Sequence, residues 1–177
     1  MASVQGMAPE QITRILAYAG FVLVGFELVN GMIIKPIKAF YANTNFAKGA
    51  PFKSYEQDVL PLHRKEFEAC QLYLRDFMRA IDSTDVLSIQ ALRKHRNDLA
   101  HDLVGRLTGL KIEEHQALFE NVNRALFKLS NYRAYQEIGA EPKLRDVDWK
   151  TVKGHEYLLF EEVVSKVKLL NLHRKDA

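Results

Sequence analysis

Residues 93–103, RKHRNDLAHDL, concentrate basic and imidazole side chains in a stretch whose apolar residues recur at helical intervals. Steps of three and four residues return to the same side of a helix. One stripe therefore carries Ile89, Leu92, Arg96, Leu99 and Leu103. Arg96 occupies a place on this stripe where an apolar residue is expected. A guanidinium there needs an anion, a partner chain or a route to water, because burying an unpaired charge is costly.

The second chemically useful residue of this segment is His101. It lies about 140° around the helix from Arg96, so the two side chains cannot reach one small ligand from a single straight helix. A second copy of the chain, related by a two-fold axis, would supply the missing half of a shared cleft. Arg93, Asn97 and His101 recur every four residues, which lets Asn97 orient the imidazole. Such a site can bind phosphate and transfer protons.

Residues 96–101, RNDLAH, resemble the R-x(4–6)-H signature of the HEPN superfamily (higher eukaryotes and prokaryotes nucleotide-binding), in which Asn often follows the Arg. The resemblance implies an all-α bundle of four to five helices that forms a homodimer with a composite active site. It also implies a metal-independent endoribonuclease of the kind found in toxin–antitoxin, abortive-infection and antiviral-defence systems. Arg96 and His101 would then be the catalytic residues.

The resemblance also implies a mechanism. A ribose 2′-OH attacks the adjacent phosphorus, two His101 side chains act as base and acid, and two Arg96 guanidiniums stabilise the transition state. The products are a 2′,3′-cyclic phosphate and a 5′-OH. Asn97 would support the catalytic pair, and Arg93 or Lys94 would guide the RNA backbone. No cofactor or metal is implied, and the partners are RNA, a second copy of the chain, and an antitoxin or other regulatory protein.

One position departs from a variant of the family. Members that are paired with an adenylylating nucleotidyltransferase antitoxin carry Tyr two residues after the His, and this chain has Leu103 there. Modification of a tyrosine at the motif is therefore not expected.

The composition predicts one cytoplasmic domain that covers residues 1–177. With 47% apolar residues, the chain can fill one core, and its net charge of +3 permits contact with phosphate without demanding it. The single cysteine, Cys70, fits a reducing compartment. Residues 17–34 are strongly apolar, but the longest uninterrupted run, 17–26, is about half the length of a membrane span. We expect a buried helix there and no role at a membrane.

Helical periodicity predicts five segments, which cover residues 9–29, 61–81, 83–105, 112–137 and 155–170. Pro36 is expected to interrupt the continuation of the first helix, and Asp82 with Ser83 to cap the third. Residues 42–55 and 139–149, which are rich in polar and loop-forming residues, are expected to be loops.

A second class of enzyme fits part of the same segment. His101 and Asp102 match the central pair of the HD metal-dependent phosphohydrolases, which are also helical. His63 with Asp146 or Asp148 could supply the outer ligands, and the bound metal would activate water.

The third alternative is a catalytically inert HEPN-like module for binding or assembly. In that case Arg96 would be an ion-paired interface residue and His101 an ordinary helix-terminal histidine. Aromatic side chains in and beside the first loop could form the partner surface, although such residues more often cover the bundle; they are Phe40, Tyr41, Phe46, Phe52 and Tyr55.

Overall fold

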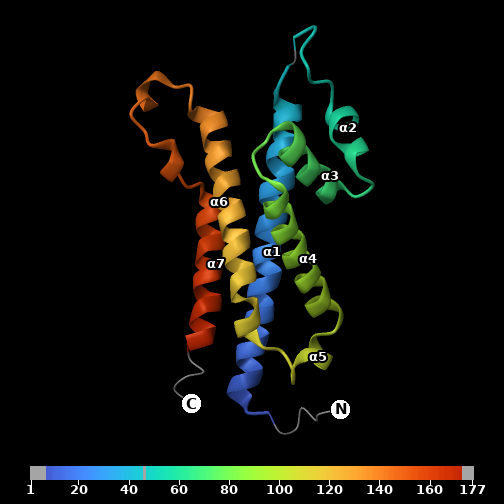
Figure 1. Ribbon diagram of the computed structural model, residues 1–177, viewed down its shortest axis with the longest axis vertical. Helices are drawn as coiled ribbons and strands as arrows, with labels where there is room; N and C mark the ends of the chain where they lie inside the picture. Colours follow the sequence, from blue (N-terminus) through green and yellow to red (C-terminus); the bar gives the residue numbers. More distant parts are fainter. Residues whose placement is uncertain (1–6, 46, 173–177) are drawn as a thin grey trace.

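Four long helices lie side by side in the computed structural model, which describes residues 7–45 and 47–172 (Figure 1). They are α1 (Pro9–Asn43), α4 (Ser83–His101), α6 (Gln116–Ile138) and α7 (His155–Leu172). Helix α1 packs against both α4 and α7, and α6 closes the bundle by packing against the same two helices. The described residues are 78% helical and contain no strand, so the expected all-α class is confirmed.

Shorter elements connect the long helices. Helices α2 (Tyr55–Asp58) and α3 (Glu66–Leu72) cover the C-terminal part of α1, whereas α5 (Leu103–Arg106) follows α4 at the other end of the bundle (Figure 1). The described residues also form five shorter turns: η2 (Leu60–Leu62), the π-helical η3 (Tyr73–Phe77), η4 (Ile112–His115), η5 (Pro142–Leu144) and η6 (Trp149–Thr151).

Helix α1 is longer than the sequence predicts, because Pro36 does not interrupt it. A proline in a helix removes one N–H and clashes with the carbonyl four residues earlier. Met32, Ile33 and Ile37 are nevertheless buried on both sides of Pro36, and this packing holds the helix together through Asn43. By length and composition α1 could also cross a membrane, a property that the core helices of soluble proteins share.

The ends of two other helices also differ from the prediction. The α-helix of the second segment begins at Glu66 instead of Pro61, which lies in the 3-10 turn η2, and it changes into a π-helical turn after Leu72. Helix α4 begins as predicted, with a capping box between Asp82 and Asp85. It ends at His101 instead of Gly105, because Asp102 leaves the helical conformation and its side chain accepts a hydrogen bond from the Gly105 amide at 3.1 Å.

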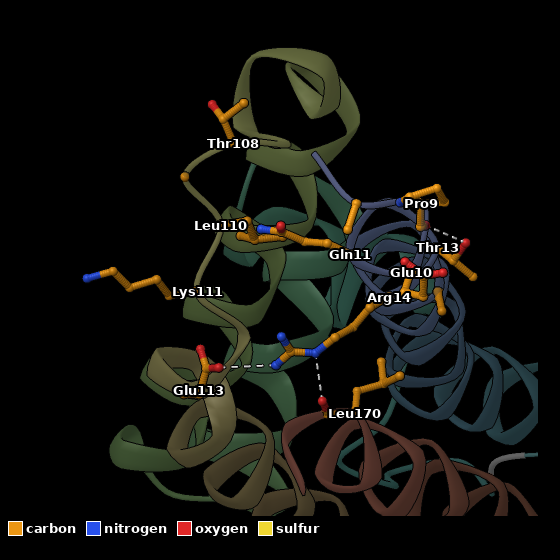
Figure 2. Close-up of a pocket in the computed structure, with 13 residues that line it drawn as sticks. Pro9, Glu10, Gln11, Thr13, Arg14, Thr108, Leu110, Lys111, Glu113 and Leu170 are labelled. Atoms are coloured by element: carbon orange, nitrogen blue, oxygen red, sulfur yellow. Dashed lines mark hydrogen bonds and ion pairs between the residues drawn. The ribbon is translucent and has the colours of Figure 1, made fainter. Parts of the chain in front are cut away.

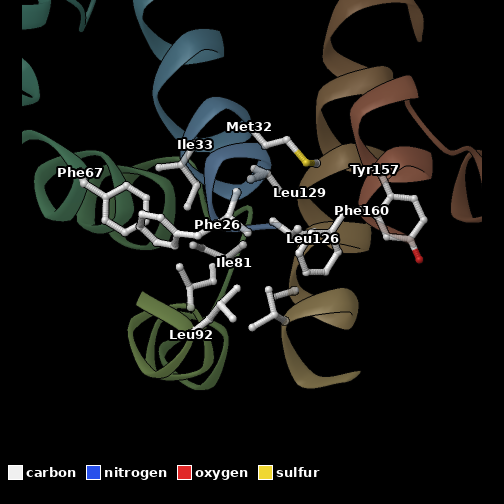
Figure 3. Packing of buried hydrophobic residues seen from close by; sticks show 14 of the residues in the cluster. Phe26, Met32, Ile33, Phe67, Ile81, Leu92, Leu126, Leu129, Tyr157 and Phe160 are labelled. Atoms are coloured by element: carbon white, nitrogen blue, oxygen red, sulfur yellow. The ribbon is translucent and has the colours of Figure 1, made fainter. Parts of the chain in front are cut away.

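The core lies between the four long helices. Figure 3 shows Phe26 of α1, Leu92 of α4, Leu126 of α6 and Phe160 of α7 meeting there. Gly25 allows the close approach of α1 and α7, since a Cβ on it would lie 3.4 Å from Phe160 and from Val163. The two helices are therefore held at a distance that leaves room for little more than a methyl group.

This packing predicts a large difference between two neighbouring residues of α7. Phe160 is fully buried, so Phe160→Ala should lower the free energy of unfolding by about 3–5 kcal/mol. Leu159 is 44% exposed, and Leu159→Ala should cost less than about 1 kcal/mol. Urea denaturation followed by circular dichroism measures both values, and similar losses in the two variants would contradict this description of the core.

Candidate active site and the adjoining surface of α1

The rotation of α4 about its axis decides which side chains of the motif face the core. Leu92, His95 and Leu99 are buried, whereas Arg96 is only partly buried and lies at the edge next to α1. The prediction that Arg96 replaces an apolar residue in the packed seam is therefore wrong in detail. His95 occupies the seam, and Arg96 lies one helical step away from it.

Arg96 is held loosely by residues of α1 and by its own neighbour. Its Nη2 donates to Glu27 Oε1 at 3.4 Å, its Nη1 donates to Asn97 Oδ1 at 3.3 Å, and the guanidinium lies 5.7 Å from the centre of the Phe26 ring. Both hydrogen bonds are longer than the usual range. The buried Nε has no hydrogen-bond partner among the described residues. The Nη1 and Nη2 atoms each carry a second N–H that an incoming anion could use.

The other residues of the motif continue around α4 from Arg96. At 100° per residue, Arg93, Asn97 and His101 lie about 60°, 100° and 140° from Arg96 on the side away from the core. Lys94 follows on the outer face and is exposed, as is His101 in the last turn of the helix. These five residues form a basic arc that runs from the α1 edge of α4 to its solvent face.

Two contacts within the basic arc differ from the expected roles. Arg93 donates through Nη1 to Glu68 of α3 and lies 5.4 Å from the centre of the Phe67 ring, so it ties α4 to α3. Asn97 accepts from Arg96, whereas it was expected to orient His101. The structure thus joins Arg96 with Asn97 and leaves the His101 ring exposed on the same arc.

A mostly apolar surface of α1 adjoins the basic arc. Leu16, Leu23 and Val24 expose 38–54% of their surface, and Gly20 lies among them with open space where its Cβ would be. Glu27, the partner of Arg96, belongs to the same side of the helix. The apolar residues on this side are spaced like those of a helix face that packs against another helix. We call Leu16, Gly20, Leu23 and Val24 the α1 face.

His95 is a residue that the sequence analysis did not single out. Its Nε2 lies 2.8 Å from the Tyr18 hydroxyl, and its ring centre lies 3.9 Å from that of His115. The cluster joins α1, α4 and η4 close to the end of the helix that carries His101. A buried histidine in a seam position could have been inferred from the helical spacing of Leu92, His95 and Leu99.

Both histidines of this cluster favour the neutral state. The pKa of His95 is lowered to about 4, chiefly by burial and also by the nearby His115 and Arg106 side chains, while Asp98 opposes the change. Burial also lowers the pKa of His115. The two imidazoles can lie this close together because both are neutral and do not repel each other.

The residues that would form the metal site of an HD phosphohydrolase are not brought together. His101 and Asp102 lie at the end of α4 next to α5, whereas Asp146 and Asp148 belong to the connection between α6 and α7 at the far end of the bundle (Figure 1). Among the described residues, no three His, Cys, Asp or Glu side chains gather as a metal-binding group.

The loop aromatics mostly pack against one another. Phe40, Tyr41, Phe52 and Tyr55 form edge-to-face pairs with centre distances of 5.1–6.4 Å, and Tyr41 also shares a hydrogen bond with Tyr73. Phe46 lies outside the described residues. This cluster covers the end of α1, as residues of this kind usually do.

A cavity of 1100 Å³ lies at the α5 end of the bundle, between the start of α1, the turn before η4 and the end of α7. Figure 2 shows that Arg14 crosses it, donating from Nε to the Leu170 carbonyl at 2.7 Å and from Nη2 to Glu113 at 3.1 Å. Lys111 points away from Arg14. Arg14 is thus used to join three chain segments.

The histidine cluster predicts that the fold loses stability in mild acid. As the pH falls below 6.5, the unfolded chain binds a proton at His95 that the folded chain does not accept until about pH 4. The free energy of unfolding should fall by about 2 kcal/mol between pH 7.5 and pH 5 from this residue alone. Urea titrations should show a shallower pH dependence for His95→Gln, whereas His155→Gln, at the exposed start of α7, should behave like the parent. Identical slopes for all three proteins would refute this account.

Comparisons of the chain with protein-family models, with curated proteins and with solved structures found no match. The function proposed below therefore rests on the chain's own residues, above all on Arg96, His101 and the α1 face.

Proposed function

We propose that this protein is a metal-independent endoribonuclease of the HEPN type that acts as a homodimer. The observation that carries the proposal is the basic arc, which begins at a loosely held Arg96 and ends at an exposed His101, beside the apolar α1 face. The arc provides a guanidinium for phosphate and an imidazole for proton transfer. The α1 face provides a surface for a second copy.

Two copies are needed because of the geometry of one helix. Arg96 faces α1 and His101 faces outward about 140° away, so one chain cannot place both groups on one phosphate. A two-fold axis that passes near the α1 face would bring the two basic arcs toward each other. Gly20, which has no side chain, would let the two α1 helices approach closely.

In such a dimer, the chemistry follows from the charges and protons that RNA cleavage moves. One His101 accepts the proton of the 2′-OH, and its symmetry mate donates a proton to the departing 5′-oxygen. The Arg96 guanidiniums exchange the weak contact with Glu27 for a non-bridging phosphate oxygen, and thereby stabilise the negative charge of the transition state. A 2′,3′-cyclic phosphate and a 5′-OH result.

The remaining residues of the basic arc would have supporting roles. Asn97, which accepts from Arg96, holds the guanidinium at the edge of α4. Lys94 is exposed on the outer face and would contact the RNA backbone. Arg93 contributes to the local positive charge while it anchors α3. A nuclease that cleaves cellular RNA restricts growth. A protein antitoxin or other regulator would therefore control this protein, which would act in toxin–antitoxin or antiviral defence.

A catalytically inert assembly module is the second candidate. The ion pairs of Arg93 with Glu68 and of Arg96 with Glu27 favour it, because they assign both arginines a partner within the chain. The two candidates share the dimer and differ in whether RNA is cut.

Cleavage by the parent protein and by two variants tests the nuclease proposal. Labelled single-stranded RNA, incubated with the protein and EDTA, should yield fragments that end in a 2′,3′-cyclic phosphate. Arg96→Ala and His101→Ala should each reduce the cleavage rate by about 100-fold or more, because they remove charge stabilisation or proton transfer. His155→Ala is the control and should cleave like the parent. Circular dichroism verifies that each variant is folded. A dimeric parent that leaves RNA intact would favour the inert module, and unchanged rates in both variants would reject the assigned residues.

The dimer is tested separately through the α1 face. Val24→Lys places a charge on an exposed position, so it should leave the monomer folded and shift the protein from dimer to monomer. Light scattering after size-exclusion chromatography measures the mass. Ile138→Lys, at an exposed position at the end of α6, is the matched control and should remain dimeric. A dimer that persists in Val24→Lys would place the interface elsewhere.

A further inference from the structure

A second cavity, of 470 Å³, lies between the C-terminal part of α1, η3 and α6. It lies toward the opposite end of the bundle from α5 and from His101 (Figure 1). Its volume is in the range of sites that enclose small molecules. Met32, Leu74 and Leu129 are buried residues that line it and make its inner part apolar. We call it the α1–α6 cavity.

Aromatic rings from three elements line the α1–α6 cavity. Phe40 comes from α1, Tyr73 from the π-helical η3 and Tyr132 from α6. Single π-helical turns inside helices often accompany functional sites, since the extra residue redirects side chains. Flat rings on several sides favour a flat ligand, which can pack against their faces and edges.

The backbone carbonyl of one lining residue lacks its ordinary partner in the helix. Pro36 has no N–H, so it cannot donate to the Met32 carbonyl as a residue four positions later normally does in a helix. Met32 and Pro36 both line the cavity. A ligand that carries an N–H could donate to this carbonyl and satisfy it.

The charges at the cavity rim compensate one another. Arg133 pairs with Glu137 at 2.6 Å and with Glu156 at 3.5 Å, and Lys35 is a further cation among the lining residues. Two cations thus face two carboxylates. The rim has no excess charge with which to attract an anion or a cation, so an uncharged ligand suits it.

We propose that the α1–α6 cavity binds an uncharged, planar heteroaromatic molecule of the size of an indole or a nucleobase, whose N–H donates to the Met32 carbonyl while its ring packs among Phe40, Tyr73 and Tyr132. This inference is independent of RNA cleavage, since it concerns residues at the other end of the bundle and needs neither Arg96 nor His101.

Calorimetric titration of the full chain with three probes tests the proposal. Indole and adenine are flat and carry N–H donors, and the tighter binder of the two identifies the source of the natural ligand. At least one of them should bind saturably with a Kd below roughly 1 mM. The matched probe 1-methylindole keeps the ring and lacks the N–H, so it should bind at least about fivefold more weakly than indole. Equal affinity for indole and 1-methylindole, or no saturable binding by any probe, would overturn the proposal.

Two variants test whether the ligand binds in this cavity. Pro36→Ala restores the N–H that bonds to the Met32 carbonyl, so it should raise the melting temperature and weaken binding of the tighter probe by about fivefold. Loss of folding cannot explain that combination. Pro142→Ala, in η5 outside the cavity, is the control and should bind like the parent. Tyr132→Leu keeps an apolar side chain without the flat ring and should weaken binding several-fold. Parent-like affinity in both Pro36→Ala and Tyr132→Leu would also overturn the proposal.

Discussion

The rotational position of α4 is the constraint on which the rest of the candidate site depends. One helical step separates His95 from Arg96, and only one of them can face the core. The structure buries His95 against Tyr18 and His115, where a neutral imidazole can be accommodated at low cost. Burying the guanidinium there would leave a charge without water or a matched partner. Arg96 is consequently placed at the α1 edge, and Asn97 and His101 follow outward from it.

This arrangement combines a rigid anchor with adaptable surface groups. The capping box and the contacts of Lys128 with Asp82 and Asp85 fix the start of α4, and the histidine cluster fixes its end. Directly after His95, Arg96 is held by two long hydrogen bonds and one ring contact. The backbone of the site is thus well supported, whereas the Arg96 guanidinium is held only by weak contacts.

Much of the fold could be predicted from the sequence, because periodicity and capping act locally. The start of α4 at Asp82 and the helical nature of all long segments followed from such signals. The end of α4 could not be predicted, since the residues from Leu103 onward fit a helix and only the cap formed by Asp102 stops it. The predicted break at Pro36 was wrong for the opposite reason. The local cost of a proline inside a helix was outweighed by the burial of Ile33 and Ile37. The polar residues of α4 could be listed from the sequence, but the choice of His95 over Arg96 for the core depended on Tyr18 and His115, which are distant along the chain.

The neighbouring positions of His95 and Arg96 have a consequence for how the gene can vary. Adding or deleting one residue between Asp82 and His95 would turn the rest of α4 by about 100° against its neighbours. A deletion would place the guanidinium where the imidazole now lies and turn the imidazole outward, whereas an insertion would turn the guanidinium further from the core and the imidazole to the α1 edge. Either change would displace the apolar residues from their contacts. Substitutions on the outer side of this helix should change the stability of the fold much less. The length of the helix should therefore vary far less than its composition.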